Sequence, residues 1–584
     1  MKTPSSYEKR PYVQISSRDR DCDVGCRQIV EAIQSMLPRQ PSRSVAIECY
    51  PGVLLEPLLN NLLPALSPAE VIQSESAFLP PCELHQKFAA ILTEDPVFGR
   101  MHPWEMEDFF DPQRLRAVRE QGCRGVAGLV VAFGPGASFI LPAADVLVYV
   151  DVARWEIQQR QRRKEVANMG LRNFGDSPAQ LYKRAFFVDW RAADRLKHRL
   201  FNRVDYWIDG NVPEDLRGLA GPVLRSALDS VSRRPFRVVP YFDPGVWGGQ
   251  WMRRRFALPE GPSNYAWGFD CVPEENSLVL RFGAHEFELP ALTLVHEHPQ
   301  QLLGEMVYRR FGAEFPIRFD FLDTMEGGNL SLQVHPLTSY IREKFGVDYT
   351  QDESYYMLAA EPDGHVFLGL REDIDRLAMA SELRAAQTGG PDFPAEKYVN
   401  RWPAAKHDHF LIPAGTIHCS GRDGVVLEIS ATPYIFTFKL WDWGRLGLDN
   451  KPRPIHLEHG LKNIQWDRTT TWVRKNLINQ TRRVASGDGW REESTGLHDL
   501  EFLETRRHWF TKPVLHDTLG NLNVLNLVEG ASAIVESPSG AFEPLTIHYA
   551  ETFIVPASVG EYTIRPSHET IDELATIKAY VRGG

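Results

Sequence analysis

The sequence has no excess of basic residues. Its 584 residues include 65 lysines and arginines against 76 aspartates and glutamates, which gives a formal net charge of -11 at pH 7. Proteins that bind nucleic acids hold the phosphate backbone mainly with clustered cations. The charge balance therefore argues against a nucleic-acid partner, and no basic stripe in the sequence offsets it.

Long uninterrupted apolar runs are also absent. The longest apolar region, Gly125 to Val150, is broken by glycines and prolines and carries Asp145. A membrane-spanning helix needs about 20 consecutive apolar residues, so this region predicts two buried strands and no membrane partner. Residues 1–10 lack the apolar core of a secretory signal, and we therefore expect a cytoplasmic protein.

Cysteine is scarce, with seven residues scattered along the chain. Disulfide-stabilised scaffolds use even numbers of closely spaced cysteines, so this pattern fits a reducing compartment. Cys22 and Cys26 have no second cysteine pair to complete a zinc ribbon. Free thiols are the better interpretation of this pair.

The length predicts several domains, because one hydrophobic core serves about 100–200 residues. Strand-like segments after residue 235, Ser277–Phe282 among them, are separated by frequent turns and predict antiparallel barrels. Apolar residues at helical spacing between Glu372 and Gln387 predict a helical insertion. The expected segments are an arm (1–43), an α/β domain (44–232), a mainly-β domain with the helical insertion (235–500) and a C-terminal barrel (501–584).

One stretch places several polar groups on a single strand face. Ser331, Gln333 and His335 alternate with apolar residues, and alternate side chains of an extended strand point to the same side. Glu353 begins a later strand-like segment, and His418 follows a tight Pro-Ala-Gly turn. A lone histidine is more often structural, but two imidazoles, a carboxylate and an amide oxygen together suit a divalent metal such as zinc.

These motifs resemble those of a known family, the type I phosphomannose isomerases, which are zinc-dependent sugar isomerases built from cupin β-barrels. The family pattern is a Leu-Ser-x-Gln-x-His-Pro strand, a later Glu and a Pro-Ala-Gly-Thr-x-His turn, and these occur here in that order. The resemblance runs from about Val239 to the C-terminus. It implies a cupin jelly-roll fold and one zinc ion per chain, with Gln333, His335, Glu353 and His418 as ligands.

The resemblance also implies catalytic and substrate-binding residues. Aldose–ketose isomerisation moves a proton between adjacent carbons through an enediol-type intermediate, and Glu428 lies close to the place of a family pocket glutamate, which makes it the expected base. Its alternative is a glutamate on an exposed strand face. Lys439 replaces a usual active-site arginine and Arg445 keeps a second basic position. Ser331 and Arg318 are the expected substrate-binding residues.

The pocket departs from the family pattern at two cations, because Asp320 and Gln351 occupy the places of family lysines. Each charge-assisted hydrogen bond contributes roughly 1.5–3 kcal/mol, so their loss weakens a site for a sugar phosphate. Arg318 would compensate if a bulge turned it inward. We therefore expect interconversion of mannose 6-phosphate and fructose 6-phosphate with a raised Michaelis constant.

Two other functions fit the same residues. One is an isomerase or epimerase of an unphosphorylated or modified sugar on the same scaffold. The other is a non-catalytic, sugar-binding regulatory protein in which zinc is structural, with all ligand positions filled. In each case the expected partner is a small sugar or sugar phosphate.

The α/β domain alternates strands and helices as a parallel sheet does, and it loosely resembles the uridine-kinase and phosphoribulokinase branch of the P-loop proteins. Its loop from Glu48 to Leu54 has neither the lysine nor the hydroxyl of a phosphate loop, so we expect a pseudo-kinase domain without phosphate transfer. The arginines of a later helix are expected on a solvated face. They are Arg154, Arg160, Arg162 and Arg163.

The C-terminal segment repeats a strand, turn and strand without a Gln-x-His motif. We therefore expect this second barrel to have no metal. Its expected role is packing against the first barrel or against another subunit of a homo-oligomer.

Overall fold

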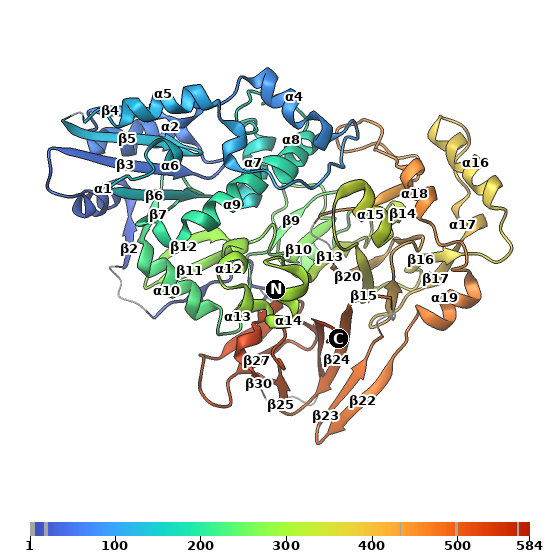
Figure 1. Ribbon diagram of the computed structural model, residues 1–584. Coiled ribbons are helices and arrows are strands. Elements are labelled where there is room, and N and C mark those ends of the chain that lie inside the picture. The colour runs from blue at the N-terminus through green and yellow to red at the C-terminus, as the bar shows by residue number, and fades with distance from the viewer. Residues whose placement is uncertain are drawn as a thin grey trace. The chain divides into compact units, whose positions relative to one another are not determined.

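The computed structural model describes residues 6–16, 21–125, 127–431, 434–496, 500–568 and 572–583. Contacts divide the chain into two compact units, shown as ribbons in Figure 1. The α/β unit comprises Tyr12–Val231 and Glu275–His298; the double-barrel unit comprises Met1–Pro11, Ser232–Glu274 and Pro299–Gly584. Among the described residues, no helix combines the length and the apolar character needed to cross a membrane.

The α/β unit is built on a seven-stranded sheet with the strand order β2-β8-β7-β6-β3-β5-β4. The neighbours from β7 to β4 are parallel, whereas β8 and β2 are antiparallel. The strands are β2 (Cys22–Val24), β3 (Ser42–Cys49), β4 (Glu70–Gln73), β5 (Gly128–Gly134), β6 (Val146–Asp151), β7 (Tyr206–Asp209) and β8 (Arg217–Ala220). The apolar region 125–150 therefore supplies two buried strands, β5 and β6.

Helices form the crossovers that parallel strands require. They are α1 (Gly25–Met36), α2 (Leu55–Pro57), α3 (Leu63–Leu66), α4 (Pro81–Leu92), α5 (Pro112–Gly122), α6 (Ala137–Ile140), α7 (Arg154–Arg162), α8 (Pro178–Arg184), α9 (Trp190–Leu200) and α10 (Gly221–Val231). A smaller sheet contains β1 (Val13–Gln14), β11 (Ser277–Phe282) and β12 (His285–Pro290), and α12 (Ala291–Glu297) follows it.

Two expectations about chain organisation differ from the structure. The described residues of the segment 1–43 do not form a separate arm, since β1, β2 and α1 belong to the α/β unit and α1 buries Ile29, Val30 and Ile33 at helical spacing. The segment Ser277–Phe282 was expected in a barrel, but as β11 it pairs with β1 and β12. A strand's apolar pattern does not name its partner, which explains this error.

Two arginines of α7 are buried, which corrects the expectation that its arginines lie on a solvated face. Arg160 donates to three backbone carbonyl oxygens at 2.8–2.9 Å, among them that of Gly52 in the loop after β3. Arg154 forms an ion pair with Asp194 at 2.5 Å. Arg163 keeps the expected exposure, with 48% of its side chain accessible. Arg160 therefore joins α7 to the loops that follow β3 and β7, and Arg154 joins α7 to α9.

The first barrel of the double-barrel unit has a six-stranded sheet, β18-β15-β20-β13-β10-β9, and a five-stranded sheet, β17-β16-β19-β14-β21. The larger contains β9 (Tyr241–Asp243), β10 (Trp267–Cys271), β13 (Arg318–Asp323), β15 (Asp352–Ala360), β18 (His409–Ile412) and β20 (Gly424–Ala431). The smaller contains β14 (Leu332–Val334), β16 (His365–Leu370), β17 (Val399–Pro403), β19 (His418–Ser420) and β21 (Phe438–Trp441). This architecture is consistent with a cupin-like domain.

Helices flank the barrel strands. They are α11 (Trp251–Arg255), α13 (Pro299–Leu303), α14 (Glu305–Phe311), α15 (Thr338–Phe345), α16 (Arg376–Gln387), α17 (Ala395–Tyr398), α18 (Leu457–Asn463) and α19 (Thr470–Asn476). In α16, which lies in the expected helical insertion, Asp375 caps the N-terminus by accepting from two backbone N–H groups. Met379 and Leu383 are buried, while Leu377 is 84% exposed. The buried face of the helix is therefore narrower than the spacing of its apolar residues predicted.

The second barrel combines a six-stranded sheet, β22-β23-β24-β31-β26-β29, with a four-stranded sheet, β25-β30-β27-β28. Its strands are β22 (Arg482–Gly487), β23 (Trp490–Ser494), β24 (Leu503–Phe510), β25 (Val514–Asp517), β26 (Asn523–Glu529), β27 (Ser532–Glu536), β28 (Leu545–His548), β29 (Thr552–Val555), β30 (Glu561–Pro566) and β31 (Leu574–Val581). Phe510, Leu525 and Phe553 belong to its apolar core. Because β23 pairs with β24, this sheet begins before the predicted boundary at residue 501.

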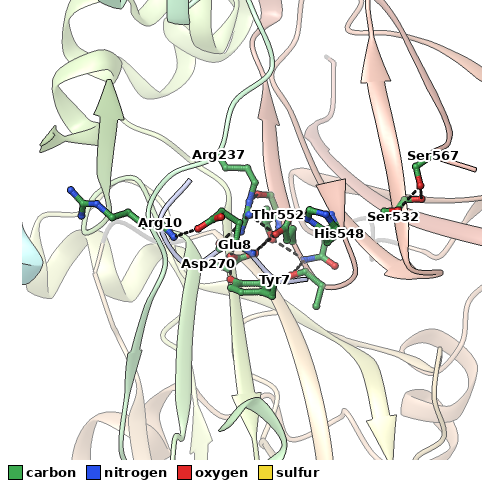
Figure 2. A network of polar contacts seen from close by, with 12 residues as sticks. Tyr7, Glu8, Arg10, Arg237, Asp270, Ser532, His548, Thr552 and Ser567 are labelled. Atoms are coloured by element: carbon green, nitrogen blue, oxygen red, sulfur yellow. Dashed lines mark hydrogen bonds and ion pairs between the residues drawn. The ribbon is translucent and has the colours of Figure 1, made fainter. Parts of the chain in front are cut away.

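A buried charge network joins the N-terminal segment to both barrels (Figure 2). Arg237 lies between two buried carboxylates, Asp270 of β10 at 3.5 Å and Glu551 next to β29 at 2.7 Å. Tyr7 donates to Asp270, and the backbone N–H of Glu8 donates to Glu551 at 2.6 Å. Buried charges are tolerated when they are paired and hydrogen-bonded, so each member of this network depends on the others.

Replacing Arg237 by methionine should therefore destabilise the double-barrel unit by about 3–5 kcal/mol, because two buried carboxylates lose their shared partner. Arg254→Met is the matched control: its ion pair with Glu326 is half exposed and is screened by solvent. Urea unfolding followed by tryptophan fluorescence compares the two variants with the wild-type protein. Equal unfolding midpoints for Arg237→Met and the wild type would contradict the role given to the network.

Candidate metal centre

Four side chains, called here the ligand cluster, converge inside the first barrel: Gln333, His335, Glu353 and His418. Nε2 of His335 lies 3.1 Å from one carboxylate oxygen of Glu353, and Nε2 of His418 lies 2.7 Å from the other. The side-chain nitrogen of Gln333 is 3.2 Å from Nε2 of His418. Candidate ligand atoms of the two histidines and the glutamate all lie within 4.8 Å of one another. The structure thus brings together the four residues expected to bind metal.

The two facing sheets of the first barrel supply these side chains. Gln333 in β14 is directly opposite His418 in β19, so their side chains share a face of the smaller sheet. His335 follows Gln333 by two residues and keeps that face. Glu353 comes from β15 of the larger sheet. The alternation that marked this strand in the sequence is therefore the feature that aims the ligands inward.

Both histidine rings are oriented by backbone carbonyl oxygens. Nδ1 of His335 lies 3.0 Å from the carbonyl oxygen of Phe436, and Nδ1 of His418 lies 2.9 Å from that of Thr416. Donation through Nδ1–H leaves the lone pair on Nε2 directed at the centre of the cluster. The candidate ligand atoms of the three buried residues His335, Glu353 and His418 therefore face one another inside the barrel. This donor set fits a divalent cation such as zinc.

Glu353 is held as a carboxylate, the form that binds metals. Burial opposes its ionisation, but His335 and His418 outweigh burial and hold the pKa of Glu353 well below its usual range. The side-chain amide of Gln351 donates to Glu353 at 2.9 Å. Gln351, which replaces a family lysine, therefore orients a ligand.

The turn before the second histidine is fixed from three directions. Gly415 has a φ of 86°, a left-handed conformation that favours glycine, and its N–H donates to the carbonyl oxygen of His335 at 3.0 Å. Asp352 accepts from the N–H of Ala414 at 2.7 Å, and Arg468 donates to the carbonyl oxygen of Ala414 at 2.7 Å. The Pro-Ala-Gly sequence is thereby tied to both ligand-bearing strands.

A row of buried side chains extends from the carboxylate ligand across the larger sheet. Glu428 in β20 is directly opposite both Tyr355 in β15 and Asp320 in β13. Tyr355 follows Glu353 by two residues, so these side chains all share the face that carries the ligand. Each of them is buried. The alternative of a glutamate on an exposed strand face therefore does not apply to Glu428.

The carboxyl groups of Glu428 and Asp320 form a pair with raised pKa values. Burial raises the pKa of Asp320 to about 7; Arg318 opposes this shift and Glu353 adds to it. Burial, followed by the charges of Asp320 and Glu353, raises the pKa of Glu428 far above its usual range. Carboxyl groups with raised pKa values are suited to moving protons near neutral pH.

Arg318 faces the same interior without the bulge that was expected to turn it inward. Strands β13 and β20 pair in unbroken register, from Arg318 opposite Ser430 to Asp323 opposite Val425. Arg318 precedes Asp320 by two residues and therefore shares its face. The register alone brings this guanidinium group to the face that carries the carboxyl pair.

The cations expected to orient substrate occupy different surroundings. Lys439 in β21 is directly opposite Gln333, which places it on the face of the ligand cluster. Burial, together with the charge of Arg453, lowers the pKa of Lys439 to about 8. Arg445 is instead held by Asp442 at 2.5 Å. Lys439 is therefore the cation whose strand position directly adjoins a ligand.

Comparison with known proteins gives different results for the two parts of the chain. Residues 25–233 match a family model described as "Domain of unknown function (DUF8485)". Part of the chain is similar to mannose-6-phosphate isomerase ManA of Bacillus subtilis, with 23% identity over 240 residues that cover 40% of this chain and 69% of that protein. The enzyme of Streptococcus mutans is 25% identical over 247 residues, covering 41% and 72%. These relatives are mannose-6-phosphate isomerases.

Solved structures with the same activity in their descriptions are more distant. The mannose 6-phosphate isomerase of Bacillus subtilis has a TM-score of 0.49 and 16% identity, and the match covers 60% of this chain and 100% of that chain. A phosphomannose isomerase from Salmonella typhimurium has a TM-score of 0.46 and 14% identity, with the same coverage. For residues 25–233 the matching family has no known function, so the kinase resemblance stays a hypothesis.

Two residues near the ligand cluster were not anticipated from the sequence. Arg453 pairs with Asp442 at 2.5 Å and donates to the hydroxyl of Ser331 at 3.4 Å. Asp442 therefore pairs with both Arg445 and Arg453, and Arg453 links it to the expected substrate-binding serine. Arg453 lies outside any strand, where no alternation could mark it. Tyr355 was detectable, because it follows the carboxylate ligand by two residues in a strand.

Removing either imidazole should remove the metal. Wild-type protein is expected to contain about one divalent ion per chain, and His335→Ala and His418→Ala to contain little, because each loses one of a tetrahedral set of donors. Elemental analysis of purified protein measures this directly. His407→Ala is the control, since its Nδ1 lies 2.9 Å from the hydroxyl of Tyr356, outside the cluster. Unchanged metal content in both ligand variants would refute the assignment.

Proposed function

We propose that this chain is a zinc-dependent aldose–ketose isomerase that interconverts mannose 6-phosphate and fructose 6-phosphate. The observation that supports it most is the position of the carboxyl pair, Glu428 and Asp320, on the same barrel face as the carboxylate of the ligand cluster. A metal site and a proton carrier side by side are what this reaction requires. The mannose-6-phosphate isomerases among the sequence relatives support the same reaction class.

In the proposed reaction Glu428 moves the proton. As a carboxylate it takes the proton from the carbon that carries the hydroxyl and returns it to the carbonyl carbon as the enediol-type intermediate collapses, while the hydroxyl proton passes from the oxygen of the first carbon to that of the second. Its raised pKa strengthens it as a base. A bound divalent cation would supply Lewis-acid stabilisation of negative charge on the substrate oxygens. The buried surroundings of Glu428 limit exchange of the transferred proton with water.

The cations around the cluster would orient the substrate. Lys439 is assigned to a sugar oxygen because it lies opposite Gln333. Arg318 approaches from the other sheet, and Arg445 with Ser331 lines the region around Asp442. Arginine and lysine donate to oxygen in different geometries, so the lysine at position 439 contacts an oxygen as a point charge where the family uses a guanidinium fork.

Replacing Glu428 by glutamine should lower kcat by about 10²–10⁴-fold, the usual contribution of general acid–base catalysis. The change keeps the shape of the side chain, so metal content should be unaffected. Glu361→Gln, at an exposed position just beyond β15, is the matched control and should retain full activity. A steady-state assay with mannose 6-phosphate measures both. Near-normal kcat in Glu428→Gln would exclude it as the base.

One observation favours an unphosphorylated sugar as a second candidate substrate. Asp320 lies on the same face as Glu428 and Glu353, so three carboxyl groups border the site. An ionised carboxylate repels a phosphate dianion, and a protonated one supplies no cation for it, whereas sugar hydroxyls donate hydrogen bonds to carboxyl oxygens in either state. Gln351, at the place of the second family lysine, is already engaged with Glu353.

The ratio of kcat/KM for mannose 6-phosphate to kcat/KM for free mannose separates the two candidates. Asp320→Lys should raise this ratio by about tenfold or more, because a charge-assisted contact to phosphate replaces a repulsion. Taking the ratio cancels any general loss of activity in the variant. A free sugar that is turned over better by the wild-type enzyme would reject the phosphate assignment but keep the isomerase. An unchanged ratio in Asp320→Lys would disprove the pocket alignment.

A further inference from the structure

A polar pocket of about 590 Å³ lies at the second barrel, between residues of the segment 479–482 and the strands that follow. None of the ligand-cluster residues lines it. Three arginines border it, Arg482, Arg506 and Arg582, against a single acidic residue, Glu504. The other lining residues, apart from a glycine, carry amide or hydroxyl side chains, Ser494 among them. A pocket with excess guanidinium groups and neutral hydrogen-bonding groups suits a polyhydroxylated anion.

Strand register places the cations in a row across four strands. Arg482 of β22 is directly opposite Ser494 of β23, Ser494 is opposite Arg506 of β24, and Arg506 is opposite Lys578 of β31. Directly opposed side chains share a face, with Cβ atoms about 4.5–5.5 Å apart. Figure 1 shows the hairpin of β22 and β23 running beside β24, which brings the first of these side chains to the others.

This arrangement sets like charges against each other. Arg506 and Lys578 are directly opposed, a pairing that destabilises a sheet. Burial lowers the pKa of Lys578 to about 8; Arg506 acts in the same direction and Glu492 opposes it. An anion in the pocket would offset the positive charge of Arg506, which lines it.

The carboxylate that lines the pocket is shared between two of its arginines. One oxygen of Glu504 lies 2.7 Å from Nε of Arg506, and the other accepts from Nε of Arg582 at 3.2 Å. Glu492 is more distant, at 3.9 Å from Arg506.

The opposite face of the same strands shows how an ordinary ion-paired sheet is built. There Glu493 of β23 is directly opposite both Arg483 of β22 and Arg507 of β24, and it pairs with Arg507 at 2.9 Å. On the pocket face the same central position holds the uncharged Ser494. The pocket face therefore lacks the central carboxylate that the opposite face has.

We propose that this pocket binds a small phosphorylated sugar at a site separate from the metal centre, with Arg482, Arg506 and Arg582 contacting the phosphate. Guanidinium groups bind phosphate oxygens in a bidentate manner, and the amide and hydroxyl side chains of the lining contact sugar hydroxyls. The second barrel thus has a ligand of its own, beyond the packing role expected from its sequence. This site does not depend on the proposed isomerase activity.

Isothermal titration of the full-length protein with glucose 6-phosphate tests the proposal. Arg482→Gln and Arg506→Gln should each weaken binding by about tenfold or more through loss of a charge-assisted contact. Arg483→Gln is the matched control, because it removes the same charge from the neighbouring exposed position on the other face of β22. The double variant His335→Ala, His418→Ala should bind as the wild type does, which separates this site from the metal centre.

Two further ligands identify the chemistry. Inorganic phosphate should bind more weakly than the sugar phosphate, since it lacks the hydroxyl contacts, and gluconate should bind more weakly than either. Tighter binding of gluconate would overturn the phosphate assignment. The site itself is refuted by an absence of saturable binding or by loss of binding in the double histidine variant. It is also refuted if Arg482→Gln and Arg506→Gln both bind with the affinity of the wild-type protein.

Discussion

The carboxylate of Glu353 joins the two sheets of the first barrel. Its oxygens contact one imidazole from each of two segments of the opposite sheet, and those rings are in turn fixed by backbone carbonyl oxygens. A buried carboxylate is tolerated only with such partners. Its negative charge, after burial, also helps to raise the pKa values of Glu428 and Asp320. Ligand geometry and proton chemistry thus rest on the same buried charge.

Sequence patterns were informative where a local period decides the structure. The spacing of Gln333 and His335 predicted a shared strand face, and the structure places both beside Glu353 and His418. Arg453 and the burial of Arg154 and Arg160 could not be anticipated, because each depends on partners far along the chain. The pairing of Ser277–Phe282 was missed for the same reason, since apolar alternation predicts a strand but does not name its neighbours.

The two barrels place different charges on similar scaffolds. In the first, strand register aligns Asp320, Glu428 and Tyr355 into an acidic row beside imidazoles. In the second, the register aligns Arg482, Arg506 and Lys578 around a serine. Because opposed residues of antiparallel strands share a face, the residue types at such positions set the charge of that face.

The network around Arg237 has a consequence for biosynthesis. Glu8 and Glu551 are 543 positions apart in the chain, and the ribosome adds residues from the N-terminus at about 5–20 per second. Tyr7 therefore emerges long before the strand that completes its surroundings exists. During that interval Arg237 and Asp270 lack the last carboxylate of the set, so the double-barrel unit reaches its final form only after Glu551 has been synthesised.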